Sequence, residues 1–218
     1  MWSRHFTDNA ALRLALLGLV LAVAGCASSG SRPEQPDRAR SEQAKADPRA
    51  AEVPPAALTM YEQAVAVMAA GDSLDAELRF KEFLLQYPDY PGAYVNLAII
   101  HGNNDNDADA QAAVDAALAI DPDYAPALNQ QGMLLRRNGK FLEAEAAYLK
   151  AVTASPDYAL AHYNLGVLNE LYLQRLDSAL QHYERYQQIV GDDEQVEKWI
   201  TDLQRRVAAS QRTANITE

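Results

Sequence analysis

Few side chains of this 218-residue chain are of the kinds that carry out catalysis. After the first 26 residues the histidines are His101, His162 and His182, far apart along the chain, and the single cysteine is Cys26. A nucleophile needs a base within hydrogen-bond reach, and a phosphate site needs a glycine-rich loop, and neither pattern is present. We therefore expect no enzyme, no cofactor and no metal site, and we interpret the three histidines as structural.

One acidic stretch, Asp105-Asn-Asp-Ala-Asp109, has the alternating carboxylates with which calcium loops begin. An EF-hand loop also needs glycine at its sixth place and glutamate at its twelfth. Those places hold Ala110 and Ala116. We therefore interpret the stretch as a turn between two helices, with Asp107 as the N-cap of the second, because Asn and Asp suit both roles. A weak surface calcium site at the same residues stays open.

The tripeptide Pro-Asp-Tyr occurs at 88–90, 122–124 and 156–158, so that each copy follows the last by 34 residues. A proline cannot continue a helix, and a fixed period of this length is typical of stacked helix–turn–helix units. Such units are stable mainly through their neighbours and build an extended binding surface. The period predicts an all-α protein, an α-solenoid.

Ending each unit near its proline gives four repeats: 57–90, 91–124, 125–158 and 159–190. The eighth and twentieth residues of the units are small, and the twenty-fourth is large, with unit four running one residue late after its longer turn at 173–177. Small residues let paired helices approach closely, and the large residue fills the space between units. The small residues are Ala64, Ala76, Ala98, Ala110, Gly132, Ala144, Gly166 and Ala179, and the large ones are Phe80, Val114, Tyr148 and Tyr183.

This spacing resembles the tetratricopeptide repeat, and residues 138–144 and 161–166 are particularly similar to its inter-helix turn and first-helix core. The resemblance covers residues 57–190 and implies about four repeats whose first helices, the A helices, line a concave groove. It places Asn96 and Asn164 where related repeats hydrogen-bond an extended peptide, although these amides could instead bond within their own helix. The partner-binding residues that it implies are Tyr61, Asn96, Asn129, Arg136, Arg137, Tyr163 and Asn164.

Charge is unevenly distributed along the repeats. Residues 57–218 contain 12 basic and 24 acidic residues, and no basic residue stands between Lys81 and Arg136. Such an acidic domain argues against nucleic acid as a ligand. Arg136 and Arg137 open a small basic island on the groove, which could hold a partner's carboxylate bidentately or balance its acidic neighbours.

A further helix is predicted after the repeats, over residues 191–210. Asp192-Asp-Glu-Gln195 resembles a capping box, and apolar residues follow at helical spacing from Val196 to Val207. This capping helix would cover the apolar end of the last repeat, with Trp199 as a plug or, alternatively, as a ligand anchor. Residues 211–218 are polar and are expected to fray.

The N-terminus has the organisation of an export signal. Arg4 and Arg13 precede the apolar run 14–24, which is too short to span a bilayer, since spanning takes about 20 apolar residues. Residues 23–26, Val-Ala-Gly-Cys, resemble the bacterial lipobox. The resemblance implies that residues 1–25 are a lipoprotein signal peptide and that Cys26 is lipidated. It also implies a location at the outer membrane, facing the periplasm, because Ala27 stands where an inner-membrane signal has Asp.

Residues 26–56 are predicted to be the lipidated cysteine and a disordered tether. The segment after Cys26 has five prolines and no aromatic residue, so it cannot bury enough apolar surface to offset the entropy of ordering. Its root-mean-square reach is about 30 Å.

Together these features predict a membrane-anchored, periplasm-facing protein–protein interaction adaptor or assembly factor of an envelope machine, either pilus- or secretion-like or of the TonB type. The layout is similar to that of pilotin-type lipoproteins. The expected partner is a peptide or helix of another protein in the concave groove. Two alternatives stay open: an accessory lipoprotein that holds a cell-wall or polysaccharide enzyme, and a glycan- or calcium-binding protein.

The lipidation of Cys26 can be tested by Cys26→Ser. Because the thiol is the atom that would be acylated, we expect the variant to accumulate as uncleaved or mislocalised precursor. Membrane fractionation and immunoblotting of the mature and precursor bands measure this. A variant that keeps a mature-sized band in the outer-membrane fraction at full yield would contradict the prediction.

Overall fold

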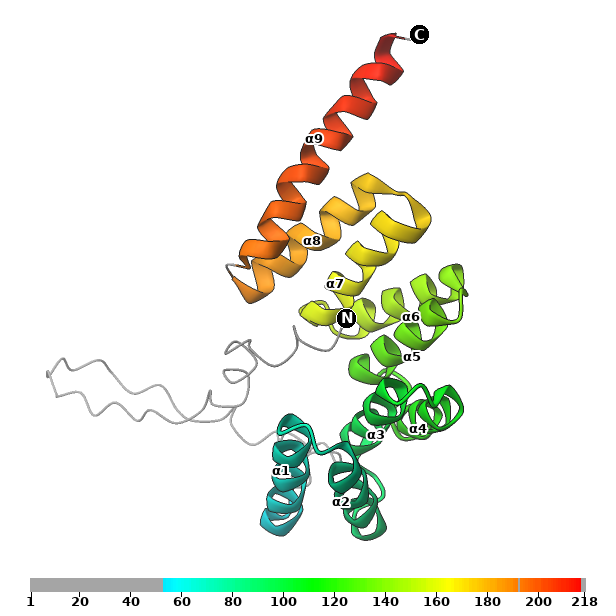
Figure 1. The fold of residues 1–218 in the computed structure, drawn as a ribbon, viewed down its shortest axis with the longest axis vertical. Helices are drawn as coiled ribbons and strands as arrows, with labels where there is room; N and C mark the ends of the chain where they lie inside the picture. Colours follow the sequence, from blue (N-terminus) through cyan, green and yellow to red (C-terminus); the bar gives the residue numbers. More distant parts are fainter. Residues whose placement is uncertain (1–52, 192, 217–218) are drawn as a thin grey trace, which may run out of the picture. The chain divides into compact units, whose positions relative to one another are not determined.

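A computed structural model describes residues 53–191 and 193–216, with side chains up to residue 212. The predicted signal peptide, Cys26 and nearly all of the tether lie outside these residues. The described ranges contain nine α-helices and no strand (Figure 1). The helices are α1 (Pro55–Ala69), α2 (Ser73–Gln86), α3 (Pro91–Asn103), α4 (Asp107–Ile120), α5 (Ala125–Arg137), α6 (Phe141–Ala154), α7 (Ala159–Leu168), α8 (Leu176–Val190) and α9 (Glu194–Ile216).

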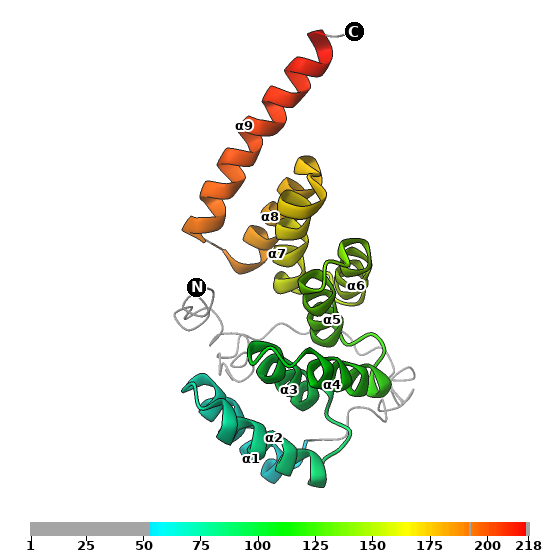
Figure 2. The ribbon, with the colours of Figure 1, turned by 45° about the vertical axis from the view of Figure 1, so that its right-hand side comes forward.

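The helices are arranged as antiparallel pairs that follow one another in chain order, α1–α2, α3–α4, α5–α6 and α7–α8 (Figures 1 and 2). The first helices of successive pairs, α3, α5 and α7, contact one another, and the second helix of each pair contacts the first helix of the next. This confirms the predicted all-α solenoid. Within the described ranges, no helix has the length and apolar character that crossing a bilayer requires.

The Pro-Asp-Tyr motif explains where one pair ends and the next begins. The residues before the three prolines, Tyr87, Asp121 and Ser155, have φ of −132°, −137° and −139° and lie outside the helical region. A proline disfavours helical geometry in the residue before it, so α2, α4 and α6 must end there. The motif's tyrosine is then the residue from which α3, α5 or α7 starts.

The close contact within a pair is made by a glycine and a tyrosine. A Cβ added to Gly132 would lie 2.5 Å from the ring of Tyr148, and one added to Gly166 would lie 2.5 Å from Tyr183. Tyr148 is fully buried and also packs against Leu165 and other residues of the next pair. The predicted small and large positions therefore meet within one unit, while the large residue also fills the space between units.

Each turn between paired helices has one residue in the left-handed region: Gly71 (φ 89°), Asp105 (57°), Gly139 (73°) and Gln174 (54°). In the fourth unit this residue comes one place late. The extra residue is absorbed by a π-helical turn, η2 (Asn169–Leu173), which continues α7. The Asn169 carbonyl oxygen accepts from the Gln174 amide and, at 2.8 Å, from the Arg175 amide, and these bonds close the wider turn.

Two predicted helix ends are wrong in detail. The N-cap of α4 is Asn106, whose side chain accepts a hydrogen bond from the Asp109 amide, and Asp107 is instead the first helical residue. Helix α9 continues to Ile216 rather than ending at residue 210, because no Gly or Pro follows to stop it. Its start is capped by Asp193, whose carboxylate accepts from the Gln195 and Val196 amides.

The predicted cap over the last repeat is formed by the first half of α9. Val196 and Leu203 are buried against α8, and the Trp199 ring lies 5.6 Å from Tyr183 and 6.0 Å from Tyr163. Trp199 therefore packs as a plug. Beyond Ala208 the described side chains of α9 are exposed, and this part of the helix extends past α8 (Figure 2).

Gly166→Ala tests the close contact. Alanine ordinarily favours a helix over glycine by about 1 kcal/mol, but here its Cβ would overlap the buried ring of Tyr183. We expect a net loss of about 1–3 kcal/mol in the free energy of unfolding, measured by urea titration followed by circular dichroism.

Gly102→Ala is the matched control, since Gly102 is also helical and an added Cβ would meet the flexible end of Arg137 at 3.3 Å. The free energy of unfolding of this control variant should be unchanged or slightly increased. Equal effects of the two substitutions would show that the tyrosine contact is not what requires glycine at residue 166.

Candidate binding surface on the A helices

The predicted contact residue Tyr61 is tied to the next repeat. Its hydroxyl accepts a hydrogen bond from the Asn96 amide at 2.9 Å, and its ring packs edge-on against Phe80 and Phe83. Burial raises the pKa of Tyr61, and the hydrogen bond from Asn96 opposes that rise. Both residues remain half-buried, so they can still contact a ligand.

Asn129 and Asn164 form a second bond of the same kind. The side-chain amide of Asn164 donates to the side-chain Oδ1 of Asn129 at 2.9 Å, and both side chains are buried. The Asn164 amide thus joins adjacent A helices, whereas the Asn129 amide group donates within α5, to the Met133 sulfur at 3.8 Å. These two residues present little surface to a ligand, and their main effect is to hold α5 and α7 in register.

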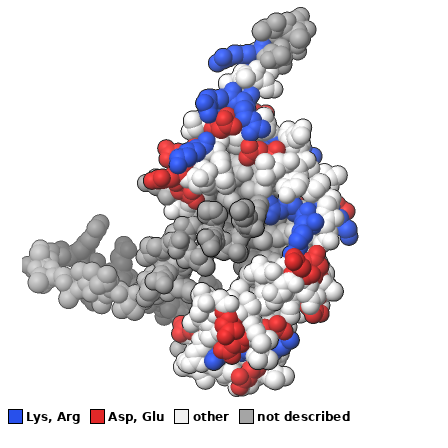
Figure 3. All heavy atoms as spheres, in the orientation of Figure 1, with Lys and Arg blue, Asp and Glu red and all other residues white. Residues whose placement is uncertain are grey.

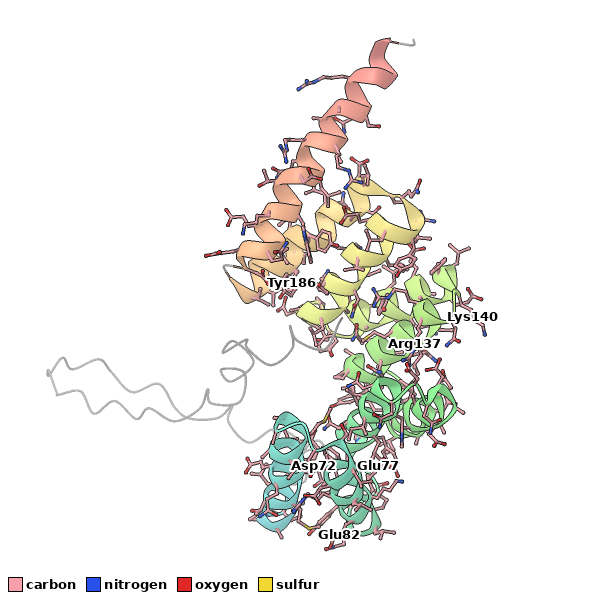
Figure 4. All side chains as sticks on the ribbon, in the orientation of Figure 1. Asp72, Glu77, Glu82, Arg137, Lys140 and Tyr186 are labelled. Carbon is pink, nitrogen blue, oxygen red and sulfur yellow. The ribbon has the colours of Figure 1, made fainter. Side chains whose placement is uncertain are left out.

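Arg137 lies where α5 meets the α3–α4 pair (Figure 4). Its guanidinium donates to the Gly102 carbonyl oxygen at 2.5 Å and forms ion pairs with Asp107 at 2.5 Å and Asp105 at 3.7 Å. A cation at the last carbonyls of α3 also suits the helix dipole. Arg137 therefore joins two repeats and neutralises part of the acidic stretch. Among the described residues, no group of three or more His, Cys, Asp or Glu side chains could hold a metal ion.

Arg136 differs from its neighbour. The carbon at the centre of its guanidinium lies 6.0 Å from the centre of the exposed Tyr172 ring, and no carboxylate within the described ranges forms an ion pair with it. Tyr163, predicted beside it on the groove, is half-buried in a cluster with Tyr186 and Trp199. The structure thus separates the predicted basic pair: Arg137 pairs with two carboxylates and the Gly102 carbonyl oxygen, whereas the half-buried Arg136 has no carboxylate partner among the described residues.

Sequence reasoning missed Tyr172 and Leu171. Both belong to η2, and Tyr172 is 43% and Leu171 60% exposed. Counting onward in the repeat register, without the π-turn, does not predict that these two side chains are exposed. The longer turn of unit four was the available signal, but it did not reveal that the extra residue enters the helix.

The surface charge is uneven, as the sequence predicted. On the face in Figure 3, Asp and Glu atoms prevail around α1 and α2, Lys and Arg atoms gather beside α5, and atoms of both kinds stand along α9. Asp72, the N-cap of α2, and Glu77 and Glu82 within the helix illustrate the acidic end (Figure 4). A hollow of about 350 Å³ between the start of α8 and α9, lined by Arg175, Asp177 and Val207 among others, includes none of the predicted contact residues.

The model of the tetratricopeptide repeat family matches residues 55–125 and 129–194. The chain belongs to the tetratricopeptide repeat family. No curated protein matches it in sequence. Two similar solved structures are PilF of Pseudomonas aeruginosa (21% identity, 71% of this chain and 70% of that one, TM-score 0.63) and a thermophilic tetratricopeptide-repeat protein of Thermus thermophilus (22%, 67% and 80%, TM-score 0.59).

A third similar structure is the first tetratricopeptide domain of Spaghetti bound to an HSP90 peptide (18% identity, 54% of this chain and 95% of that one, TM-score 0.50). An O-GlcNAc transferase of Thermobaculum terrenum is matched over 26% of its own length. Tetratricopeptide repeats are generally non-catalytic scaffolds, and the fold is that of a protein-interaction module.

Two of the histidines meet inside the fourth repeat. His162 Nε2 lies 3.1 Å from the Pro156 carbonyl oxygen, which can only accept, so we assign the hydrogen to Nε2. The His162 Nδ1 then accepts from His182 Nδ1 at 3.2 Å. Burial lowers the pKa of His162, and burial together with the nearby His162 lowers the pKa of His182 to about 4.

This pair predicts a loss of stability in acid. Both histidines have a lower pKa folded than unfolded, so the unfolded chain binds protons first as the pH falls. The stability that the two histidines contribute is fully present above about pH 7, where unfolded histidine is neutral, and it is lost as the pH falls towards 4. His182→Gln keeps a donor for His162 without titrating, so the melting temperature of the variant should fall less than that of the wild type over this range.

The control is His101→Gln on α3, whose melting curve should follow the pH dependence of the wild type. If His182→Gln also follows it, the histidine pair does not govern acid stability.

Proposed function

We propose that this tetratricopeptide-repeat protein is a lipid-anchored adaptor or assembly factor at the outer membrane, facing the periplasm, that holds a segment of a partner protein on the A-helix face. The observation that carries the proposal is that face itself, a row of half-buried and polar side chains across α3, α5 and α7. Its members include Asn96, Ile99, Met133, Arg136 and Tyr163.

The inter-repeat hydrogen bonds support this use of the face. Tyr61–Asn96 and Asn129–Asn164 join neighbouring A helices, and Arg137 joins α5 to the end of α3. A binding surface whose parts are already held in place loses less conformational entropy when a ligand binds. Neighbouring helices pack about 10 Å apart, so an extended peptide of about six residues covers two repeats.

The location rests on the N-terminal features. The short apolar run, the Val-Ala-Gly-Cys sequence and the proline-rich segment before the repeats suit an anchored domain on a flexible tether. An envelope machine, pilus- or secretion-like or of the TonB type, is the kind of partner we favour, because an adaptor tethered to a membrane acts on proteins assembled there.

The proposal is tested by placing a photo-activated cross-linking amino acid at Met133 on the A-helix face and, as a matched control, at the exposed Ala146 on α6. After irradiation of cells, we expect a discrete protein adduct from position 133 and little or none from 146. Mass spectrometry of the adduct identifies the partner and the contacting segment.

An envelope protein joined through an extended or helical segment is the expected result. Adducts from position 146 with none from 133 would place the partner on the outer face and overturn the assignment. A cell-wall or polysaccharide enzyme as the adduct would favour the accessory-lipoprotein alternative.

A further inference from the structure

The one-residue insertion in the fourth repeat produces an exposed apolar patch beside the A-helix face. In η2, Leu171 is 60% exposed and Tyr172 is 43% exposed. The ring of Tyr172 rests on Phe141, 4.7 Å between centres, and Leu142, which follows Phe141 in the sequence, is 62% exposed. We call Phe141, Leu142, Leu171 and Tyr172 the η2 patch. Turns of π-helix are costly and are frequent at functional sites.

Arg136 borders the η2 patch and differs in its electrostatic surroundings from the other arginines of the repeats. Its guanidinium faces the Tyr172 ring at 6.0 Å, and the described residues supply no carboxylate to it. Glu170, the acidic residue of η2, already accepts from Arg206 at 2.7 Å and from the Tyr183 hydroxyl at 3.3 Å. The described arginines that do have a carboxylate partner are Arg79, Arg137, Arg175, Arg185, Arg205 and Arg206.

The Tyr148 hydroxyl is buried and has no hydrogen-bond partner among the described residues. Burial raises the pKa of Tyr148 to about 12, the positive charge of Arg136 opposes the rise, and Tyr172 adds to it.

We propose that Arg136 and the η2 patch anchor a carboxylate of the partner segment, an Asp or Glu side chain or the C-terminus, with an adjacent apolar side chain on Tyr172 and Leu171. This inference rests on the proposed function and names the chemistry that its partner must carry. A guanidinium pairs with a carboxylate through two parallel hydrogen bonds, and its flat face stacks on an aromatic ring at the same time. Arg137 takes no part, because Asp107 and the Gly102 carbonyl already hold it.

A single carboxylate fits this surface better than a polyanion. The repeat domain has twice as many acidic as basic residues, so a ligand with many negative charges is repelled before it reaches Arg136. One carboxylate attached to an apolar group meets one cation and one apolar patch. The site therefore selects for a local pairing of acid and apolar side chain.

The experiment uses two small probes of the same shape, 3-phenylpropionate and its uncharged amide, titrated into the isotope-labelled protein. Side-chain Nε–H signals of arginine and ring signals of tyrosine are followed by NMR. We expect the carboxylate to shift the Arg136 and Tyr172 signals saturably, with millimolar affinity at least about tenfold tighter than that of the amide, since a charge-assisted hydrogen bond is worth about that factor. Raising the salt concentration should weaken the carboxylate alone.

Arg136→Gln should remove the difference between the two probes, while Arg185→Gln, a change at an arginine paired with Asp157 elsewhere on the fourth repeat, should preserve it. Equal binding of acid and amide, or shifts that persist in Arg136→Gln, would overturn the inference. Because the probes report on Arg136 without any partner protein, this failure is separate from failure of the cross-linking experiment. A partner cross-linked at position 133 whose contacting segment lacks a carboxylate would overturn this inference and leave the adaptor function intact.

Discussion

The contact on which the rest of the structure depends is the approach of paired helices at Gly132 and Gly166. At these two positions the tyrosine ring of the second helix lies directly on the backbone of the first, with no room for a Cβ. The same rings are buried from the other side by the next pair or by α9. In the third and fourth repeats this contact therefore sets both the spacing within a repeat and the packing between repeats, and it fixes how the side chains of α5 and α7 are placed.

Between repeats, hydrogen bonds of polar side chains fix the register of the helices, which apolar packing alone does not. An apolar contact tolerates sliding, whereas a hydrogen bond between two amides is satisfied only in one register. The bonds Tyr61–Asn96, Asn129–Asn164 and Arg137–Gly102 each join residues 35 positions apart, one repeat to the next. Because Asn129 and Asn164 are buried, losing one partner would leave the other unsatisfied, which makes the bonds selective for the observed stacking.

Much of this fold could be predicted from the sequence because its determinants are periodic. The Pro-Asp-Tyr spacing, the small residues and the large aromatic depend only on the chain's own repeat, so they locate the helices and their turns. The candidate surface was predicted less well, because its side chains have partners from other repeats. Nothing near Asn164 indicates that Asn129 will accept its hydrogen bond, and nothing near Arg137 indicates that Asp107, 30 residues earlier, will pair with it. The N-cap predicted at Asp107 is made instead by the neighbouring Asn106, and the Asp107 carboxylate pairs with Arg137.

In the fourth repeat, the one additional residue creates an exposed surface that the three regular repeats do not have. In the first three units the left-handed turn residue comes at the same place, so no residue is left over to point outward. One additional residue in unit four must be accommodated either in the turn or in the helix. It enters the helix as a π-turn, closed at the Asn169 carbonyl oxygen, and thereby moves Tyr172 onto Phe141 and under the guanidinium of Arg136. An arginine of one repeat and an aromatic ring of the next are brought together by the insertion, and this makes the junction of the third and fourth repeats chemically different from the other two.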